Sequence, residues 1–251
     1  MAKRRAQRRD AMDSIIESAL QPGRFIGWNE GSSFVSELRR LEGELAKVVS
    51  ADPARGVALY ETFIAGCNLK AEEIDDSDGE LGTFASGLYC GWITARQAAG
   101  ADHGETARLL LARMDDDDYG FCNDSERSAV KVLDKPGLEA FEREVRARFD
   151  KESAALAKGK RPVPHPNYAR DRWGGMLRAI YSEQRNIEKY LDLTARTELT
   201  QADCEAISTM FQARRKLYDA LAWLEQGIQM GKPESSNAAP ATSSLRCGAP
   251  C

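Results

Sequence analysis

Residues 204–233 match the spacing of one tetratricopeptide-like helical hairpin, and this pattern constrains the fold more than any other feature of the chain. The repeat sets bulky and small residues at fixed positions on two antiparallel helices and has a period of 34 residues. Small residues belong where two helix backbones approach closely, and Ser208 and Ala220 fill those positions. Larger residues fill the space between helices, as Phe211 and Leu224 do. The pattern therefore predicts two packed helices.

A fainter copy of the pattern lies one period upstream. Trp173 and Gly174 fit its bulky and small positions, and Tyr190 fits a packing position. Asn186 does not suit a close approach of two helices. Together the two copies predict two tetratricopeptide-like hairpins over residues 168–231. The alternative is an ordinary helical bundle whose spacing coincides.

Apolar residues also recur with a helical period upstream of these hairpins. The stripes cover residues 33–48, 57–64, 79–93, 107–114, 129–133 and 136–149. Asp52 and Pro53 form a helix start, and Thr200 with Asp203 matches a capping box. No strand-like alternation of useful length occurs. We therefore predict an all-α fold of antiparallel hairpins, a tetratricopeptide-like α-solenoid or bundle.

Three segments are predicted to lie outside the helical units. Residues 1–13 form a basic arm, expected to be disordered, ahead of an N-terminal helical unit over residues 14–158. Three prolines between residues 159 and 167 forbid a continuous helix, which predicts a linker there. Residues 232–251 are rich in Pro, Ser and Ala, which predicts a disordered tail.

The helix predicted from Pro136 onward carries several Glu residues four places before Arg. Glu139 precedes Arg143, and Glu142 precedes Arg146. This orientation stabilises an exposed helix face by only about 0.2–0.5 kcal/mol per pair. These residues are therefore expected on the surface and suggest no site.

The charge and composition argue against several classes of partner. The 251-residue chain has a net charge of −4, so its bulk charge favours neither nucleic acid nor an anionic membrane. The longest apolar runs are too short to span a bilayer, and no signal peptide is visible. We expect a cytoplasmic protein that contacts no membrane.

Two acidic turns are the sharpest candidates for chemistry. Taking Gly120 as the sixth residue of a calcium-binding loop makes Asp115 first, Asp117 third and Glu126 twelfth. Tyr119 then occupies the fifth position and offers no carboxylate. The turn over residues 75–79 fits worse. Acidic turns between helices usually cap helix N-termini, so we predict no bound metal and keep calcium as the alternative.

Other catalytic or metal-binding material is sparse in the sequence. The two histidines, His103 and His165, lie in loops far from any cysteine or motif serine. Cys247 and Cys251 form the closest cysteine pair, which we assign to an unstructured tail. We therefore predict no catalytic residues and no cofactor. Four aromatic residues are expected in the core, with a peptide-binding groove as the alternative. They are Trp92, Trp173, Tyr181 and Trp223.

Several stretches together carry a family resemblance. They are the acidic turn 75–79 ahead of Phe84, the segment MDDDDYGFC at 114–122, residues 132–134 ahead of Leu138, and ALAWLEQG at 220–227. The set resembles a family of bacterial all-helical proteins known as a domain of unknown function, over residues 15–231. The resemblance implies a tetratricopeptide-like fold and a bacterial cytoplasmic source. It supplies no catalytic residues, and its members generally continue with more hairpins beyond residue 231.

The sequence therefore favours a non-catalytic scaffold that binds a protein or peptide along a concave face. One alternative is a metal-assisted enzyme, which requires the two acidic turns to meet in space. The other is a self-assembling module in which the last hairpin, at residues 220–228, docks a second copy. In that case a charge at Leu224 would disrupt a dimer, unless Leu224 is fully buried in its own hairpin.

Overall fold

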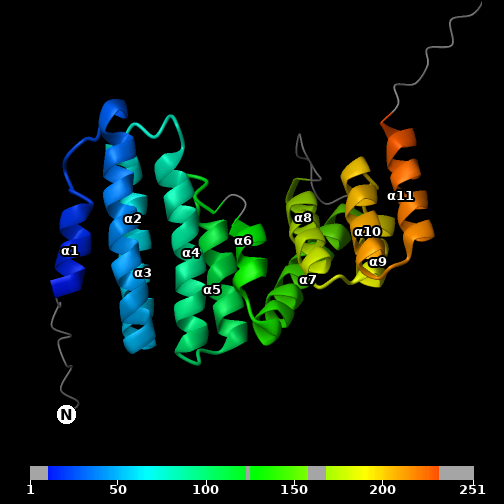
Figure 1. Ribbon diagram of the computed structural model, residues 1–251, viewed down its shortest axis with the longest axis horizontal. Coiled ribbons are helices and arrows are strands. Elements are labelled where there is room, and N and C mark those ends of the chain that lie inside the picture. Colours follow the sequence, from blue (N-terminus) through cyan, green and yellow to red (C-terminus); the bar gives the residue numbers. More distant parts are fainter. Residues whose placement is uncertain (1–10, 123–124, 158–167, 232–251) are drawn as a thin grey trace, which may run out of the picture. The chain divides into compact units, whose positions relative to one another are not determined.

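The computed structural model describes residues 11–122, 125–157 and 168–231, and this part of the chain is all-α (Figure 1). The described residues form eleven α-helices and one short 3-10 helix. The α-helices are α1 (Ala11–Ala19), α2 (Trp28–Ala51), α3 (Pro53–Lys70), α4 (Glu80–Ala98), α5 (His103–Asp115), α6 (Ser125–Val132), α7 (Lys135–Ala157), α8 (Tyr168–Glu183), α9 (Ile187–Arg196), α10 (Gln201–Ala213) and α11 (Leu217–Met230). The predicted all-α class is confirmed.

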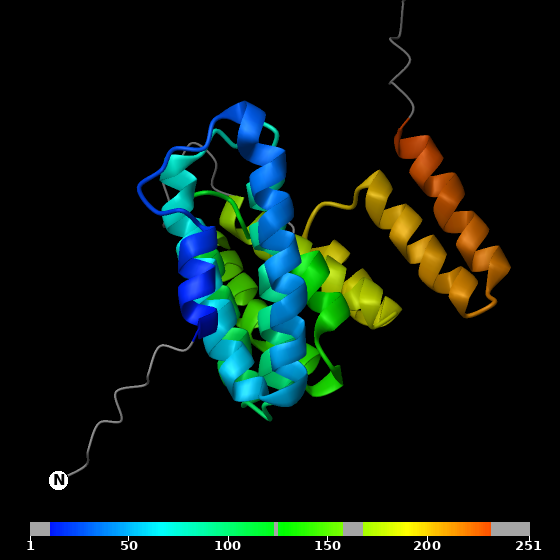
Figure 2. The ribbon, with the colours of Figure 1, turned by 60° about the vertical axis from the view of Figure 1, so that its left-hand side comes forward.

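Contacts along the chain define two compact units, residues 1–193 and 194–251. In the first unit α2, α3 and α4 pack against one another, and α1 lies against α3 (Figures 1 and 2). Farther along, α6 packs on α4 and α8, and α7 packs on α5 and α8. Trp92 on α4 is the largest fully buried side chain. Phe63 of α3 and Phe84 of α4 pack edge to face, with their ring centroids 5.3 Å apart.

The helix starts expected from local sequence are present. The Asp52 side chain accepts a hydrogen bond from the Arg55 amide at 3.0 Å, and Pro53 opens α3. The Thr200 side chain and the Asp203 carboxylate complete a reciprocal capping box at the start of α10. Both predictions are confirmed, because such caps need only residues a few positions apart.

The predicted basic arm is too long. Residues 11–13 form the first turn of α1 rather than part of a disordered arm, and Asp13 is buried there against Arg55 of α3. An ion pair across 42 positions leaves no mark in local periodicity. The rest of the arm (1–10), the linker (159–167) and the tail (232–251) lie outside the described residues.

The loop between α1 and α2 is held by residues that come much later in the chain. Lys70 at the end of α3 is buried, and its ammonium donates to the carbonyl oxygens of Gln21 (3.0 Å) and Arg24. Ile26 and Ile74 form an isolated parallel bridge. The Ile26 amide donates to the Glu73 carbonyl oxygen at 2.8 Å, and the Asp75 amide donates to the Ile26 carbonyl oxygen at 2.9 Å. The loop is therefore fixed by the end of α3.

The boundary between the units differs from the predicted linker. It falls between Leu193 and Thr194, because α8 packs on α6 and α7 of the first unit. Gly174 marks a close approach of two helices, but α8 approaches Phe149 of α7 there and not the other helix of its predicted hairpin. A Cβ on Gly174 would lie 3.6 Å from that ring.

The α8–α9 and α10–α11 turns share one backbone pattern. Arg185 and Arg215 each adopt a positive φ, 51° and 59°. The following amides, of Asn186 and Lys216, donate to Tyr181 and Phe211 at 2.9 and 3.0 Å. Equivalent residues of the two turns are thus 30 positions apart, four fewer than the predicted offset of 34.

In the second unit α10 packs on α11. Ser208 and Ala220 are buried at 1 and 2 % exposure, as expected for positions of close approach. The tightest approach of the two helices lies away from the turn that joins them. A Cβ on Gly227 would sit 3.0 Å from the Cβ of Cys204. Only small residues fit at this contact, so α10 packs on the side of α11 that carries Ala220 and Gly227.

Candidate functional site

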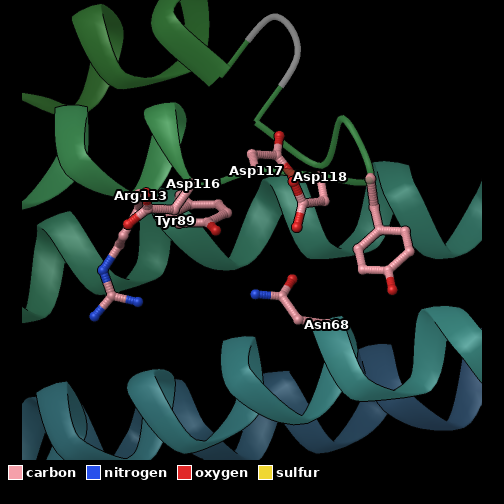
Figure 3. Close-up of a pocket in the computed structure, with 7 residues that line it drawn as sticks. Asn68, Tyr89, Arg113, Asp116, Asp117 and Asp118 are labelled. Carbon is pink, nitrogen blue, oxygen red and sulfur yellow. The ribbon is translucent and has the colours of Figure 1, made fainter.

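The acidic turn after α5 borders a polar cavity of about 270 Å³ (Figure 3). Its walls come from α3, α4, α5 and the turn itself, and the lining residues are Asn68, Tyr89, Arg113, Asp116, Asp117, Asp118 and Tyr119. In Figure 3, Asn68 faces the loop that carries Asp117 and Asp118, whereas the Arg113 guanidinium points away from them. That guanidinium pairs with Glu61 at 3.2 Å.

The two carboxylates expected to start a calcium loop already have partners. Asp115 pairs with Arg148 and Arg172, each at 3.4 Å. Asp117 accepts hydrogen bonds from the amides of Phe121 (3.0 Å) and Cys122 (2.6 Å). The Glu126 side chain lies outside the described residues. Asp115 therefore links the turn to α7 and α8, and Asp117 caps the backbone that follows it.

The first acidic turn uses its carboxylate in the same way. Asp76 accepts from the amides of Leu81 (2.8 Å) and Gly82 (2.9 Å), which caps α4. The two turns are neighbours, because a Cβ on Gly82 would lie 3.5 Å from the Asp76 carboxylate and 3.6 Å from the Phe121 ring. Within the described residues, no group of three or more His, Cys, Asp or Glu side chains is arranged to hold a metal ion.

Replacing Asp117 by Ala is expected to lower the free energy of unfolding by about 1–2 kcal/mol, the usual cost of losing a side-chain cap. Two amides would lose their acceptor. Urea unfolding followed by circular dichroism measures this. The neighbouring Asp118 is exposed, so Asp118→Ala is expected to change stability by less than about 0.5 kcal/mol. Equal effects of the two substitutions would contradict the capping role.

The thiol and phenol beside this cavity are held in their neutral forms. Burial is the main cause that raises the pKa of Cys122 to about 11. Burial also raises the pKa of Tyr89 well above its ordinary value. A thiol with so high a pKa is a poor nucleophile near neutral pH. His103 at the start of α5 lies 3.5 Å from Asp134. His165, Cys247 and Cys251 lie outside the described residues.

A buried ionic cluster around Glu142 was not expected from the sequence. Glu142 is 8 % exposed rather than on the surface. Its carboxylate accepts from Lys189 Nζ at 2.6 and 2.9 Å, from Gln184 at 3.3 Å and from the Tyr181 hydroxyl at 3.3 Å. The Glu–Arg spacing within the helix suggested an exposed face, because the actual partners lie about 40 residues away. The cluster borders a cavity of about 500 Å³, and it fastens α7 to the end of α8 and the start of α9.

Three of the four aromatic candidates are core residues, as predicted. Trp92, Trp173 and Tyr181 are buried. The guanidiniums of Arg148 and Arg172 lie 5.0 and 4.8 Å from the centre of the Trp173 ring. Trp223 on α11 is only half-buried. These aromatic rings therefore stabilise helix packing rather than line a groove.

The most exposed apolar surface of the second unit lies on α11. Leu217, Tyr218, Leu221 and Ile228 are 67, 92, 53 and 60 % exposed. Leu224 is half-buried, so it is not enclosed within its own hairpin. On a helix, residues 217, 221, 224 and 228 fall on one face. We call these four residues the α11 seam. The acidic turns are engaged in capping and pairing, whereas this face presents apolar surface to solvent.

No helix among the described residues has the length and apolar character needed to cross a membrane. In comparisons with known proteins, no family model matches the sequence, and neither a curated protein nor a solved structure matches it.

Proposed function

We propose that the chain is a non-catalytic scaffold that binds a helical protein or peptide segment through the α11 seam. The observation that carries this proposal is the exposure of Leu217, Leu221 and Ile228 on one face of a single helix. An apolar helix face of this kind is the surface that packs against the apolar stripe of another helix. Side chains exposed singly would need no such explanation, but a continuous stripe does.

The cytoplasmic location and the bacterial tetratricopeptide-like family belong to the same proposal. The acidic net charge and the resemblance of four sequence motifs to that family support it. The recurrence of one turn geometry at Arg185 and Arg215 is also in keeping with a repeat. Tetratricopeptide-like repeats serve mainly to present surfaces to partners.

Selection of helical peptides on the full chain tests the scaffold function. Enriched peptides are expected to carry apolar residues at spacings of three and four, and to bind Leu221→Glu at least about tenfold more weakly than the wild type. Gln226 lies on the opposite side of α11, so Gln226→Glu is the matched control and should bind like wild type. Equal binding to both variants would reject the proposal, as would a monomeric chain that enriches no peptide.

A further inference from the structure

The spacing of the α11 seam suits a second copy of the same seam, and this inference rests on the function proposed above. Its four residues, 217, 221, 224 and 228, are separated by four, three and four positions. That spacing reads the same in both directions. It is also the spacing at which apolar residues meet between two packed helices. We propose that the seam binds the same seam of a second copy, with the two α11 helices antiparallel.

The spacing allows an antiparallel register in which every seam residue meets another seam residue. A twofold axis beside residues 222 and 223 puts Leu217 of one copy against Ile228 of the other, and Leu221 against Leu224. Each contact then occurs twice, as an isologous interface requires. Tyr218 and Glu225 flank the seam on the same side, near opposite ends. The register brings the Tyr218 hydroxyl of one copy beside the Glu225 carboxylate of the other.

Charge favours the antiparallel over the parallel arrangement. Arg215 and Lys216 directly precede α11, at the end of the helix where the backbone dipole is positive. Lys216 makes no side-chain cap, and the last turn of α11 carries no basic residue. In the antiparallel pair these cations lie beside the carbonyl end of the partner helix, where positive charge is favourable. A parallel pair would set the cations of both copies side by side.

The exposed apolar area places such a pair at the small end of specific interfaces. Leu217, Tyr218, Leu221 and Ile228 together expose on the order of 500 Å². Burial on both copies then approaches about 1,000 Å², the lower limit for a specific interface. The small residues Ala220 and Gly227 face α10 instead, so pairing through the seam leaves the α10–α11 contact intact.

The segments of this sequence outside the described residues contain too few large apolar residues to form a competing stripe. Residues 1–10, 158–167 and 232–251 contain only Met1, Val163 and Leu245 as large apolar residues. One such residue per segment cannot cover four seam positions spread over a helix of about 21 Å. A second copy supplies all four at matching positions.

Light scattering after size exclusion, and sedimentation over a wide concentration range, test the proposal on the full chain. The wild type is expected to reach twice the mass of one chain. Leu217→Lys and Ile228→Glu are each expected to raise the dimer dissociation constant by on the order of 100-fold, because each sets a charge against an apolar residue in both contacts. Circular dichroism should be unchanged, since both positions are exposed. Gln226→Glu is the matched control and should remain dimeric.

Mixing the variants tests the direction of the helices. An equimolar mixture of Leu217→Lys and Ile228→Glu is expected to restore the dimer, because the antiparallel register pairs the new lysine with the new glutamate. A mixture of Leu217→Lys with Leu217→Glu should not. Rescue by the second mixture instead of the first would overturn the antiparallel register.

The failures of the two proposals are distinguishable. A wild-type chain that stays monomeric at every concentration would overturn self-pairing. If that monomer still binds the selected peptides and Leu221→Glu does not, the scaffold function stands without the second copy. A monomer that binds no peptide would reject both.

Discussion

Replacing Trp92 by Ala is expected to lower the free energy of unfolding by about 3–5 kcal/mol, the range found when a fully buried aromatic side chain is truncated. The indole is 0 % exposed. Its Nε1 donates to Glu61 at 3.1 Å, and the guanidiniums of Arg96 and Arg113 lie 5.1 and 5.0 Å from its ring. Truncation removes apolar burial, leaves a cavity and takes a donor from Glu61.

Trp28 supplies a matched control for this prediction. It is also a tryptophan on a helix, but it is 62 % exposed at the start of α2. Trp28→Ala is therefore expected to change the free energy of unfolding by less than about 0.5 kcal/mol. Urea unfolding monitored by far-ultraviolet circular dichroism compares the two. Equal destabilisation, or a Trp92→Ala change below about 1 kcal/mol, would contradict the packing argument.

The second large effect is expected at Lys70. Lys70→Met keeps most of the aliphatic stem but removes the ammonium that donates to the carbonyl oxygens of Gln21 and Arg24 and pairs with Glu73 at 3.2 Å. We expect the free energy of unfolding to fall by about 2–4 kcal/mol, because two carbonyl oxygens and a carboxylate lose a charged donor at a buried site.

Lys47 is a control that separates the effect of burial from the effect of ion pairing. It forms an ion pair at the same sequence spacing, with Glu44 at 2.8 Å, but its side chain is 72 % exposed. Lys47→Met should cost no more than about 0.5 kcal/mol, since solvent screens the exposed pair. Chemical denaturation of both variants gives the comparison. A loss at Lys47 as large as that at Lys70 would show that the pair, not the buried carbonyl contacts, supplies the stability.

The features that local sequence could predict are those whose partners lie within one helical turn. The Asp52 cap, the Thr200–Asp203 capping box and the periodic apolar stripes all belong to this class, and they are present. The Asp13–Arg55 pair and the Glu142–Lys189 pair were missed because their partners lie more than 40 residues away. At Glu142, charge spacing within one helix suggested an exposed carboxylate, whereas the fold supplies a partner.

The candidate site shows the same division. The sequence identified the apolar residues of the last helix but assigned Leu224 to the space between α10 and α11. The structure places Ala220 and Gly227 against α10 and leaves Leu221 and Ile228 exposed. Periodicity gives the residues that share a face, but the neighbouring helix decides which face stays open. Which face of α11 packs on α10 depends on the close contact between Gly227 and Cys204.

The anchored loop ahead of α2 has a consequence for the order in which the chain acquires structure. Lys70, Glu73 and Ile74, which hold this loop, follow it by about 50 positions. A ribosome synthesises the N-terminus first. The connection from α1 to α2 must therefore emerge without its anchors and wait until all of α3 has been made. This loop is therefore synthesised well before the residues that can fix it in place.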